Sequence, residues 1–247
     1  MKTLFLFALF ILLSSYSFSQ QEPSQYLNDG IASVQDGAFD DAVNYLTMFL
    51  KSDPQNAVGL FNRAMAYYFL NDYVNAEQDA TGAINVDPQY KDAFVIRGRI
   101  YTAVKNYDGA VSDFNSAIDI DPNFGSAFMY RALVYKAQGD YPMAVSDLNS
   151  ALTVEPTLLD AYLFRGEIYV SMGNYNDAIK DLNLYIANFQ NKAAAFSARG
   201  LAFYQTGKYK EALSDLEKAV KIDPGLESDF SNVMTEAQNR IKSEENK

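Results

Sequence analysis

The sequence predicts an all-α solenoid of six 34-residue helix–turn–helix repeats, closed by a further C-terminal helix. The first observation behind this prediction is a 34-residue period that several residue types share. The second is that apolar residues between these markers keep helical spacing, as at Phe94, Tyr101 and Ala110. Such a period indicates stacked repeats, because no single repeat can bury its apolar face alone. The markers include an alanine at Ala42, Ala76, Ala110, Ala144, Ala178 and Ala212, and an aromatic residue at Phe39, Tyr73, Tyr107, Tyr141, Tyr175 and Tyr209.

The first segment, residues 1–19, is interpreted as a secretory signal peptide. Lys2 gives a positive start, residues 4–13 form an unbroken apolar run, and Ser17 and Ser19 fit a cleavage site after Ser19. That run is too short to cross a bilayer and no later one is long enough, so no membrane span is expected after cleavage. The segment is bacterial in style, which predicts an exported protein in the periplasm or outside the cell.

Six repeats follow within residues 20–225, at about 23–56, 57–90, 91–124, 125–158, 159–192 and 193–225. In the third repeat we expect a first helix over 92–101, a turn over 105–108 and a second helix over 109–120. Prolines near the repeat ends stop the second helices, because the residue before a proline avoids helical geometry. Gln190 stands where the fifth repeat should have its proline, which predicts a looser or differently angled junction there. The prolines are Pro54, Pro88, Pro122, Pro156 and Pro224.

A small residue recurs in the first helix of every repeat. Glycine inside a helix costs about 0.5–1 kcal/mol relative to alanine, so its repeated use indicates close helix–helix approach. We expect these residues to face the repeated alanine of the second helix. They are Gly30, Ala64, Gly98, Ala132, Gly166 and Gly200.

The last segment, residues 226–247, predicts a solvating helix that covers the sixth repeat, with residues 243–247 frayed. Its apolar stripe is Leu226, Phe230, Val233, Met234, Ala237 and Ile241.

A charged pair also repeats, because five repeats carry an arginine and an aspartate at the same fixed offset, i and i+16. The first repeat lacks both members, with Asp29 and Tyr45 in their places. Their joint absence predicts structural Arg–Asp pairs inside each repeat. The pairs are Arg63 with Asp79, Arg97 with Asp113, Arg131 with Asp147, Arg165 with Asp181, and Arg199 with Asp215.

The composition argues against several functions. A formal net charge of −11 repels phosphate backbones, so nucleic acid is not an expected partner. The chain has no Cys and no His, which removes thiol nucleophiles, the usual general base and the commonest metal ligand. No phosphate-binding loop, nucleophile elbow or EF-hand spacing is found. We therefore expect neither an enzyme nor a bound cofactor or metal.

The repeat pattern resembles the tetratricopeptide repeat, from Pro23 to Pro224: a small residue, an aromatic, an alanine and a closing proline recur with the 34-residue period. The resemblance implies a right-handed α-α superhelix with a concave groove that binds peptides or protein segments. Family groove positions fall here on the candidate binding residues Phe61, Met65, Tyr68, Phe69, Arg99, Met129, Leu133 and Lys136.

Two functions remain open at this point. The apolar, methionine- and aromatic-containing groove fits a protein-binding adaptor of the cell envelope. The same surface also fits a structural scaffold that self-associates into a homo-oligomer. The sequence identifies no partner.

Overall fold

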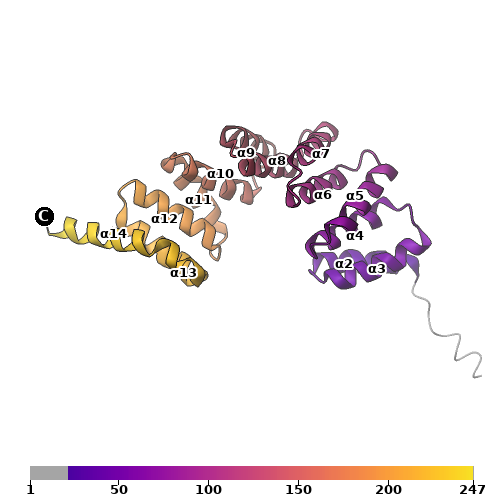
Figure 1. The fold of residues 1–247 in the computed structure, drawn as a ribbon, viewed down its shortest axis with the longest axis horizontal. Coiled ribbons are helices and arrows are strands. Elements are labelled where there is room, and N and C mark those ends of the chain that lie inside the picture. Colours follow the sequence, from indigo (N-terminus) through magenta and orange to yellow (C-terminus); the bar gives the residue numbers. More distant parts are fainter. Residues whose placement is uncertain (1–21, 247) are drawn as a thin grey trace, which may run out of the picture. The chain divides into compact units, whose positions relative to one another are not determined.

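The structure, a computed structural model, describes residues 22–246, so the predicted signal peptide lies outside the described residues. The described chain is helical, without strands, and divides into two compact units on either side of the boundary between Ile100 and Tyr101. Within each unit, Figure 1 shows helices following one another as hairpin-like pairs, such as α2 with α3 and α12 with α13. The helices are α2 (Pro23–Gln35), α3 (Phe39–Ser52), α4 (Ala57–Phe69), α5 (Tyr73–Val86), α6 (Lys91–Ala103), α7 (Tyr107–Ile120), α8 (Gly125–Gln138), α9 (Tyr141–Val154), α10 (Leu159–Ser171), α11 (Tyr175–Asn188), α12 (Ala193–Gln205), α13 (Tyr209–Ile222), a 3₁₀ turn (Pro224–Leu226) and α14 (Glu227–Glu245).

The predicted 34-residue period is confirmed in the helix starts. The even-numbered helices α2 to α12 begin one period apart from each other, and so do the odd-numbered helices α3 to α13. In the third pair the helices are longer than expected: α6 begins at Lys91 and α7 at Tyr107. The turn before α7 is correspondingly shorter, because Asn106 caps α7 by accepting a hydrogen bond from the Gly109 backbone N–H.

The core consists of the repeated alanines and the larger side chains beside them. Ala42, Ala76, Ala110, Ala144, Ala178 and Ala212 are fully buried. Each alanine allows two helix backbones to approach, and larger side chains fill the space along the contact. The largest side chains with almost no exposure are Phe114, Leu46, Ile96, Ile100, Leu148, Ile168, Leu182, Leu216 and Val134.

The small residues of the first helices do face the second helices, but they do not chiefly face the alanine that the sequence indicates. A Cβ built on Gly30 would lie 2.5 Å from Leu46 Cγ, and one on Gly166 would lie 2.7 Å from Leu182 Cγ. The side chain that each of these glycines accommodates is therefore the leucine one helical turn after the alanine.

The turn between the two helices of each pair holds one residue with positive φ, at the same place in all six repeats. It is Gly37 (φ 76°), Asn71 (61°), Lys105 (62°), Gly139 (81°), Gly173 (78°) and Gly207 (77°).

Lys105 is the residue at this position whose side chain fits positive φ least well. The left-handed conformation costs an ordinary L-residue about 1–2 kcal/mol. Replacing lysine by glycine removes this cost, but the unfolded chain then has more conformational freedom, which offsets part of the gain. Lys105→Gly is therefore expected to raise the free energy of unfolding by about 0.5–1 kcal/mol, measured by urea unfolding. Gly139→Ala is the reciprocal variant, because a Cβ there meets no atom within 4 Å, so any loss is due to the backbone. Stabilisation by Gly139→Ala would contradict this explanation.

The Arg–Asp pairs are confirmed in four of the five repeats. The arginine Nε and Nη2 each donate to one carboxylate oxygen of the aspartate, over 2.6–2.8 Å. The four aspartates are only 5–6% exposed. Arg97 and Asp113 belong to different compact units, and their pairing stays a prediction. The confirmed pairs are Arg63–Asp79, Arg131–Asp147, Arg165–Asp181 and Arg199–Asp215.

The repeated arginines make a second contact that was not expected from the sequence. The Nη1 group donates to a side chain 16 residues earlier, in the second helix of the preceding repeat. Arg63 reaches Thr47 Oγ1 at 3.1 Å, Arg97 reaches Thr81 Oγ1 at 3.2 Å, and Arg165 reaches Asn149 Oδ1 at 2.7 Å. Each of these guanidinium groups thus links its repeat to the repeat before. The equivalent acceptors for Arg131 and Arg199 are Asn115 and Asn183.

The junction between the fifth and sixth repeats is not loosened by Gln190. Tyr185 replaces the smaller alanine of other repeats, yet it is only 5% exposed and lies in one core cluster with Ile186 and Phe196. The ring of Phe189 packs on Tyr185, with the centroids 5.0 Å apart. A larger side chain therefore fills this junction, so the packing is not loose there, and a different angle between the two repeats stays a prediction.

The C-terminal helix covers the last repeat as predicted. On α14, Ala237 is buried and Phe230, Val233, Met234 and Ile241 are half-buried, while the other face is exposed. The helix continues to Glu245, whose Oε1 accepts a hydrogen bond from Lys210 Nζ at 2.9 Å. Residues 243–245 are thus helical rather than frayed.

Candidate functional site

Four aromatic side chains gather where α4 ends and where α3 and α5 begin. Phe69, the last residue of α4, stacks on Phe39 with ring centroids 4.6 Å apart and planes 11° apart. The ring of Tyr68 meets that of Phe69 edge-on at 5.4 Å and that of Tyr73 at 6.0 Å. The guanidinium of Arg99 adds a positive charge to this group. We call Phe39, Tyr68, Phe69, Tyr73 and Arg99 the Phe69 cluster.

The guanidinium of Arg99 lies over the faces of two of these rings. Its Cζ is 4.6 Å from the centroid of Tyr68 and 5.6 Å from that of Phe69. Cation–π contacts of this kind contribute about 0.5–1 kcal/mol at exposed sites. Arg99 therefore adds a contact that restrains the rings of Tyr68 and Phe69.

Phe69 is the exposed member of the Phe69 cluster, and its other residues are half-buried. Phe69 is 43% exposed and the following residue, Leu70, is 37% exposed. The position of Phe69 in the first repeat is taken by Gln35, so a large ring at this place is not required by the repeat itself. Aromatic residues and arginine are also the types that most often supply binding energy in protein interfaces.

Phe61 and Met65, the other two candidates on α4, are half-buried and pack into the core. Phe61 contacts the ring of Tyr90, with centroids 5.1 Å apart. Met65 packs against a buried cluster that contains Ala64 and Ile96. Phe61 and Met65 therefore pack against the same buried residues as Tyr68 and Tyr73, and they add little exposed surface to the cluster.

Tyr90 gives this packing a measurable pH dependence. Burial, followed by the Asp92 and Asp87 carboxylates, raises its pKa to about 12. The folded protein therefore keeps the phenol proton through a range in which an unfolded tyrosine loses it, so stability should fall as pH rises from about 10 to about 12. Tyr90→Phe has no such proton, and its urea midpoint should fall less steeply over this range. Equal slopes for the two proteins would refute the assignment.

The three candidates of the second compact unit do not form a comparable surface. Met129 is 5% exposed and belongs to a core cluster with Ala132 and Leu148, so it is not available to a partner. Leu133 is half-buried. Lys136 Nζ binds Glu167 Oε2 at 2.6 Å, which ties α8 to α10 and neutralises its charge.

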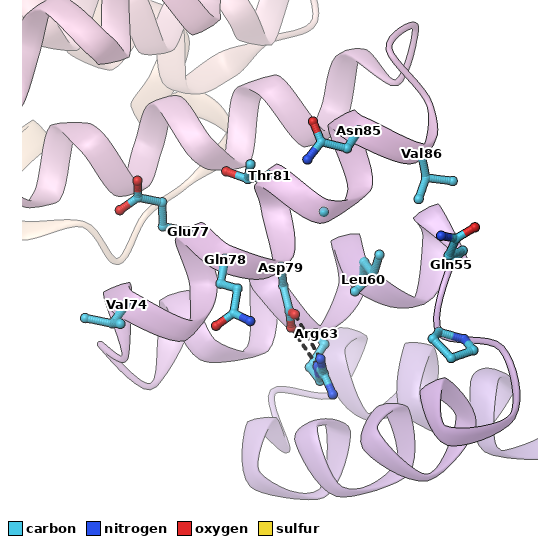
Figure 2. Close-up of a pocket in the computed structure, with 12 residues that line it drawn as sticks. Gln55, Leu60, Arg63, Val74, Glu77, Gln78, Asp79, Thr81, Asn85 and Val86 are labelled. Atoms are coloured by element: carbon cyan, nitrogen blue, oxygen red, sulfur yellow. Dashed lines mark hydrogen bonds and ion pairs between the residues drawn. The ribbon is translucent and has the colours of Figure 1, made fainter.

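A cavity of about 770 Å³ lies along α5 in the first compact unit. In Figure 2, Val74 and Val86 mark its two ends, and Arg63 and Asp79 are joined by their ion pair. The amide side chains of Gln55, Gln78 and Asn85 also line the cavity, together with Glu77 and Thr81. Because the carboxylate of Asp79 is bound by Arg63, the pair serves the fold and is not available as a general base.

The residues that could hold a metal or carry acid–base chemistry are dispersed. Within residues 22–246, no three Asp or Glu side chains come together as a metal site would require. Four of the repeated aspartates are held by arginines.

Tyr68, Phe69 and Arg99 were predicted from the sequence as members of one site, whereas Phe39 and Tyr73 were not. In the sequence, the latter two are recognised only as the repeated aromatic at the start of each second helix. The signal that could have found them is the order of the helices along the solenoid. Phe69, the last residue of α4, contacts Phe39 at the start of α3, and Tyr68 contacts Tyr73 at the start of α5.

Profiles of the tetratricopeptide repeat match residues 61–123, 159–188 and 193–226, which together make up about half of the chain. No curated protein sequence matches it.

Similar solved structures share the fold at low sequence identity. A chain of the APC/C hetero-tetramer Cut9–Hcn1 has a TM-score of 0.80 at 17% identity over 89% of this chain, which spans only 44% of that one. A tetratricopeptide repeat protein from Parabacteroides merdae has a TM-score of 0.67 at 21% identity, covering 92% of this chain and 88% of its own. YrrB, a TPR protein with an unusual peptide-binding site, has a TM-score of 0.57 at 19% identity, covering 78% and 97%. The matched profiles and the 34-residue helix pairs show that this chain is a tetratricopeptide-repeat protein.

Proposed function

We propose that this protein is a non-catalytic adaptor that binds a peptide or protein segment through the Phe69 cluster, in the groove of its repeats. The observation that carries the proposal is that Phe69, 43% exposed, stacks on Phe39 and meets Tyr68 edge-on, with Arg99 over the rings of Tyr68 and Phe69. An exposed aromatic surface held in place by its own contacts is pre-organised, so little side-chain entropy is lost on binding. The unusual peptide-binding site of YrrB supports this use of the fold.

We also propose that the adaptor acts after export, in the periplasm or outside the cell. The support is the sequence of residues 1–19, with its positive start, apolar run and small residues. None of the helices in residues 22–246 is both long and apolar enough to cross a membrane.

Selection from a displayed library of random peptides tests the function and needs no candidate partner. Residues 20–247 serve as bait, and each enriched peptide is titrated against the wild type and against Phe69→Ser. We expect the Phe69→Ser change to weaken binding at least about tenfold, because a central aromatic residue is removed. Val74→Ser is the matched control, since Val74 is 78% exposed and lines the α5 cavity instead.

The outcomes separate the two functions that the sequence leaves open. Loss of binding with Val74→Ser but not with Phe69→Ser would move recognition to the α5 cavity and overturn the proposal. Failure to enrich any peptide, together with a concentration-dependent dimer that Phe69→Ser dissociates, would favour the self-associating scaffold. The oligomeric state is measured by sedimentation velocity on both proteins.

A further inference from the structure

Acidic residues stand beside Phe39 and Tyr73 on the segments that carry these rings of the Phe69 cluster. Asp36 is the C-cap of α2, just before Gly37, and a Cβ built on Gly37 would lie 4.0 Å from Phe39 Cζ. Asp40 follows Phe39 in the first turn of α3, and Asp72 caps α5 directly before Tyr73. Three acidic residues therefore stand within three positions of Phe39 or Tyr73 in the sequence.

Asp36 has no structural reason to be acidic. A carboxylate at the C-terminal end of a helix opposes the helix dipole, so its charge is unfavourable at this place. The other five repeats have Leu70, Val104, Gln138, Met172 and Thr206 at the same position, none of them charged. Within residues 22–246, the Asp36 carboxylate makes no hydrogen bond or ion pair, and it is exposed.

Basic residues are missing from the same segments. Residues 35–41 and 70–74 contain no lysine or arginine. Arg99 is the cation of the cluster itself, and it lies over the rings of Tyr68 and Phe69. The charge around the apolar surface is therefore predominantly negative, as is the net charge of −11 for the whole chain.

We propose that the partner is a basic amphipathic segment of another protein. Its apolar or aromatic side chain packs on Phe69 and Leu70, and its flanking lysines or arginines face Asp36, Asp40 and Asp72. This inference rests on the proposed function and specifies the chemical class of the bound segment. Complementary charge raises the association rate and selects against acidic sequences, more than it adds affinity.

Two synthetic peptides with the same apolar residues test the inference. One carries lysines at the flanking positions and the other carries glutamates, and both are titrated by fluorescence anisotropy. We expect the lysine peptide to bind at least about tenfold tighter at low ionic strength, because each exposed charge pair contributes a factor of about two to five. The preference should shrink towards about 1 M salt, where screening acts over about 3 Å.

Variants of single aspartates show which carboxylates cause the preference for the lysine peptide. Asp36→Asn and Asp40→Asn should each weaken the lysine peptide about two- to fivefold and leave the glutamate peptide unchanged or improved. Asp229→Asn is the matched control, because this exposed acid of α14 belongs to the other compact unit and gives the same change in net charge. Asp36→Asn should not lower the thermal midpoint, since it removes an unfavourable charge at a helix end.

Equal affinity for the lysine and glutamate peptides, with both lost in Phe69→Ser, would overturn the basic-partner inference and leave the proposed function standing. Tighter binding of the glutamate peptide would also overturn it. Failure of both peptides, together with failure of the random library, would remove the proposed function itself.

Discussion

Replacing Asp181 by alanine is expected to lower the free energy of unfolding by about 3 kcal/mol or more, because the change leaves the Arg165 guanidinium without its buried partner. Asp181 accepts two hydrogen bonds from Arg165, at 2.7 and 2.8 Å, and is 5% exposed. Removing one member of such a pair costs more than the pair contributes, since the remaining charge stays desolvated. Urea unfolding followed by circular dichroism measures the loss.

Asp177, on the same helix, provides the control. Its ion pair with Lys180 has side chains that are 55% and 74% exposed, so Asp177→Ala should cost at most about 1 kcal/mol. A double variant, Arg165→Leu with Asp181→Leu, should recover part of the loss because no buried charge remains. Its recovery should be incomplete, because Arg165 also donates to Asn149. Equal costs for Asp177→Ala and Asp181→Ala would show that the repeated pairs contribute no more than surface ion pairs.

Gly166→Ala is expected to destabilise the protein by about 1–3 kcal/mol, the usual cost of overpacking a core. The added Cβ would lie 2.7 Å from Cγ of Leu182, which has no exposed surface. The clash outweighs the gain of about 0.5–1 kcal/mol that alanine brings inside a helix. Thermal and urea unfolding measure the net effect.

At Gly82, replacement by alanine is expected to have the opposite effect on stability. This glycine is also inside a helix, but a Cβ there would lie 3.4 Å from Leu60 Cδ1, which is ordinary contact. Gly82→Ala should therefore leave stability unchanged or raise it by up to about 1 kcal/mol. The double variant Gly166→Ala with Leu182→Ala should lose less than the sum of the two single changes, because the clash is gone. Strict additivity would mean that Leu182 is not what the glycine accommodates.

Most of the fold could be predicted from the sequence because a 34-residue period assigns the two helices of every repeat before any contact is known, and an apolar stripe indicates the C-terminal helix. The Arg–Asp pairs followed from the joint absence of both residues in the first repeat. A period gives the position along the helix but not the direction of each side chain, so Ala178 and not Leu182 was expected opposite Gly166. The second hydrogen bond of each arginine was missed for the same reason, and its acceptor is Thr in some repeats and Asn in others.

The candidate site was only partly predictable. Family groove positions found Tyr68, Phe69 and Arg99, which the structure brings together. The same positions also named Met129, which is buried, because exposure at a groove position depends on the size of the side chains around it. The ring of Phe39 joins the cluster through a contact between repeats, which a single-repeat pattern does not contain.

Backbone hydrogen exchange, with and without a peptide selected from the library, tests most directly whether the Phe69 cluster is the recognition surface. We expect slower exchange on binding at the end of α4, around residues 65–73, and around residues 36–41 where α3 begins, with α9 to α14 unchanged. Protection along residues 74–86 of α5 alone, or in the second compact unit alone, would contradict the assignment of binding to this cluster.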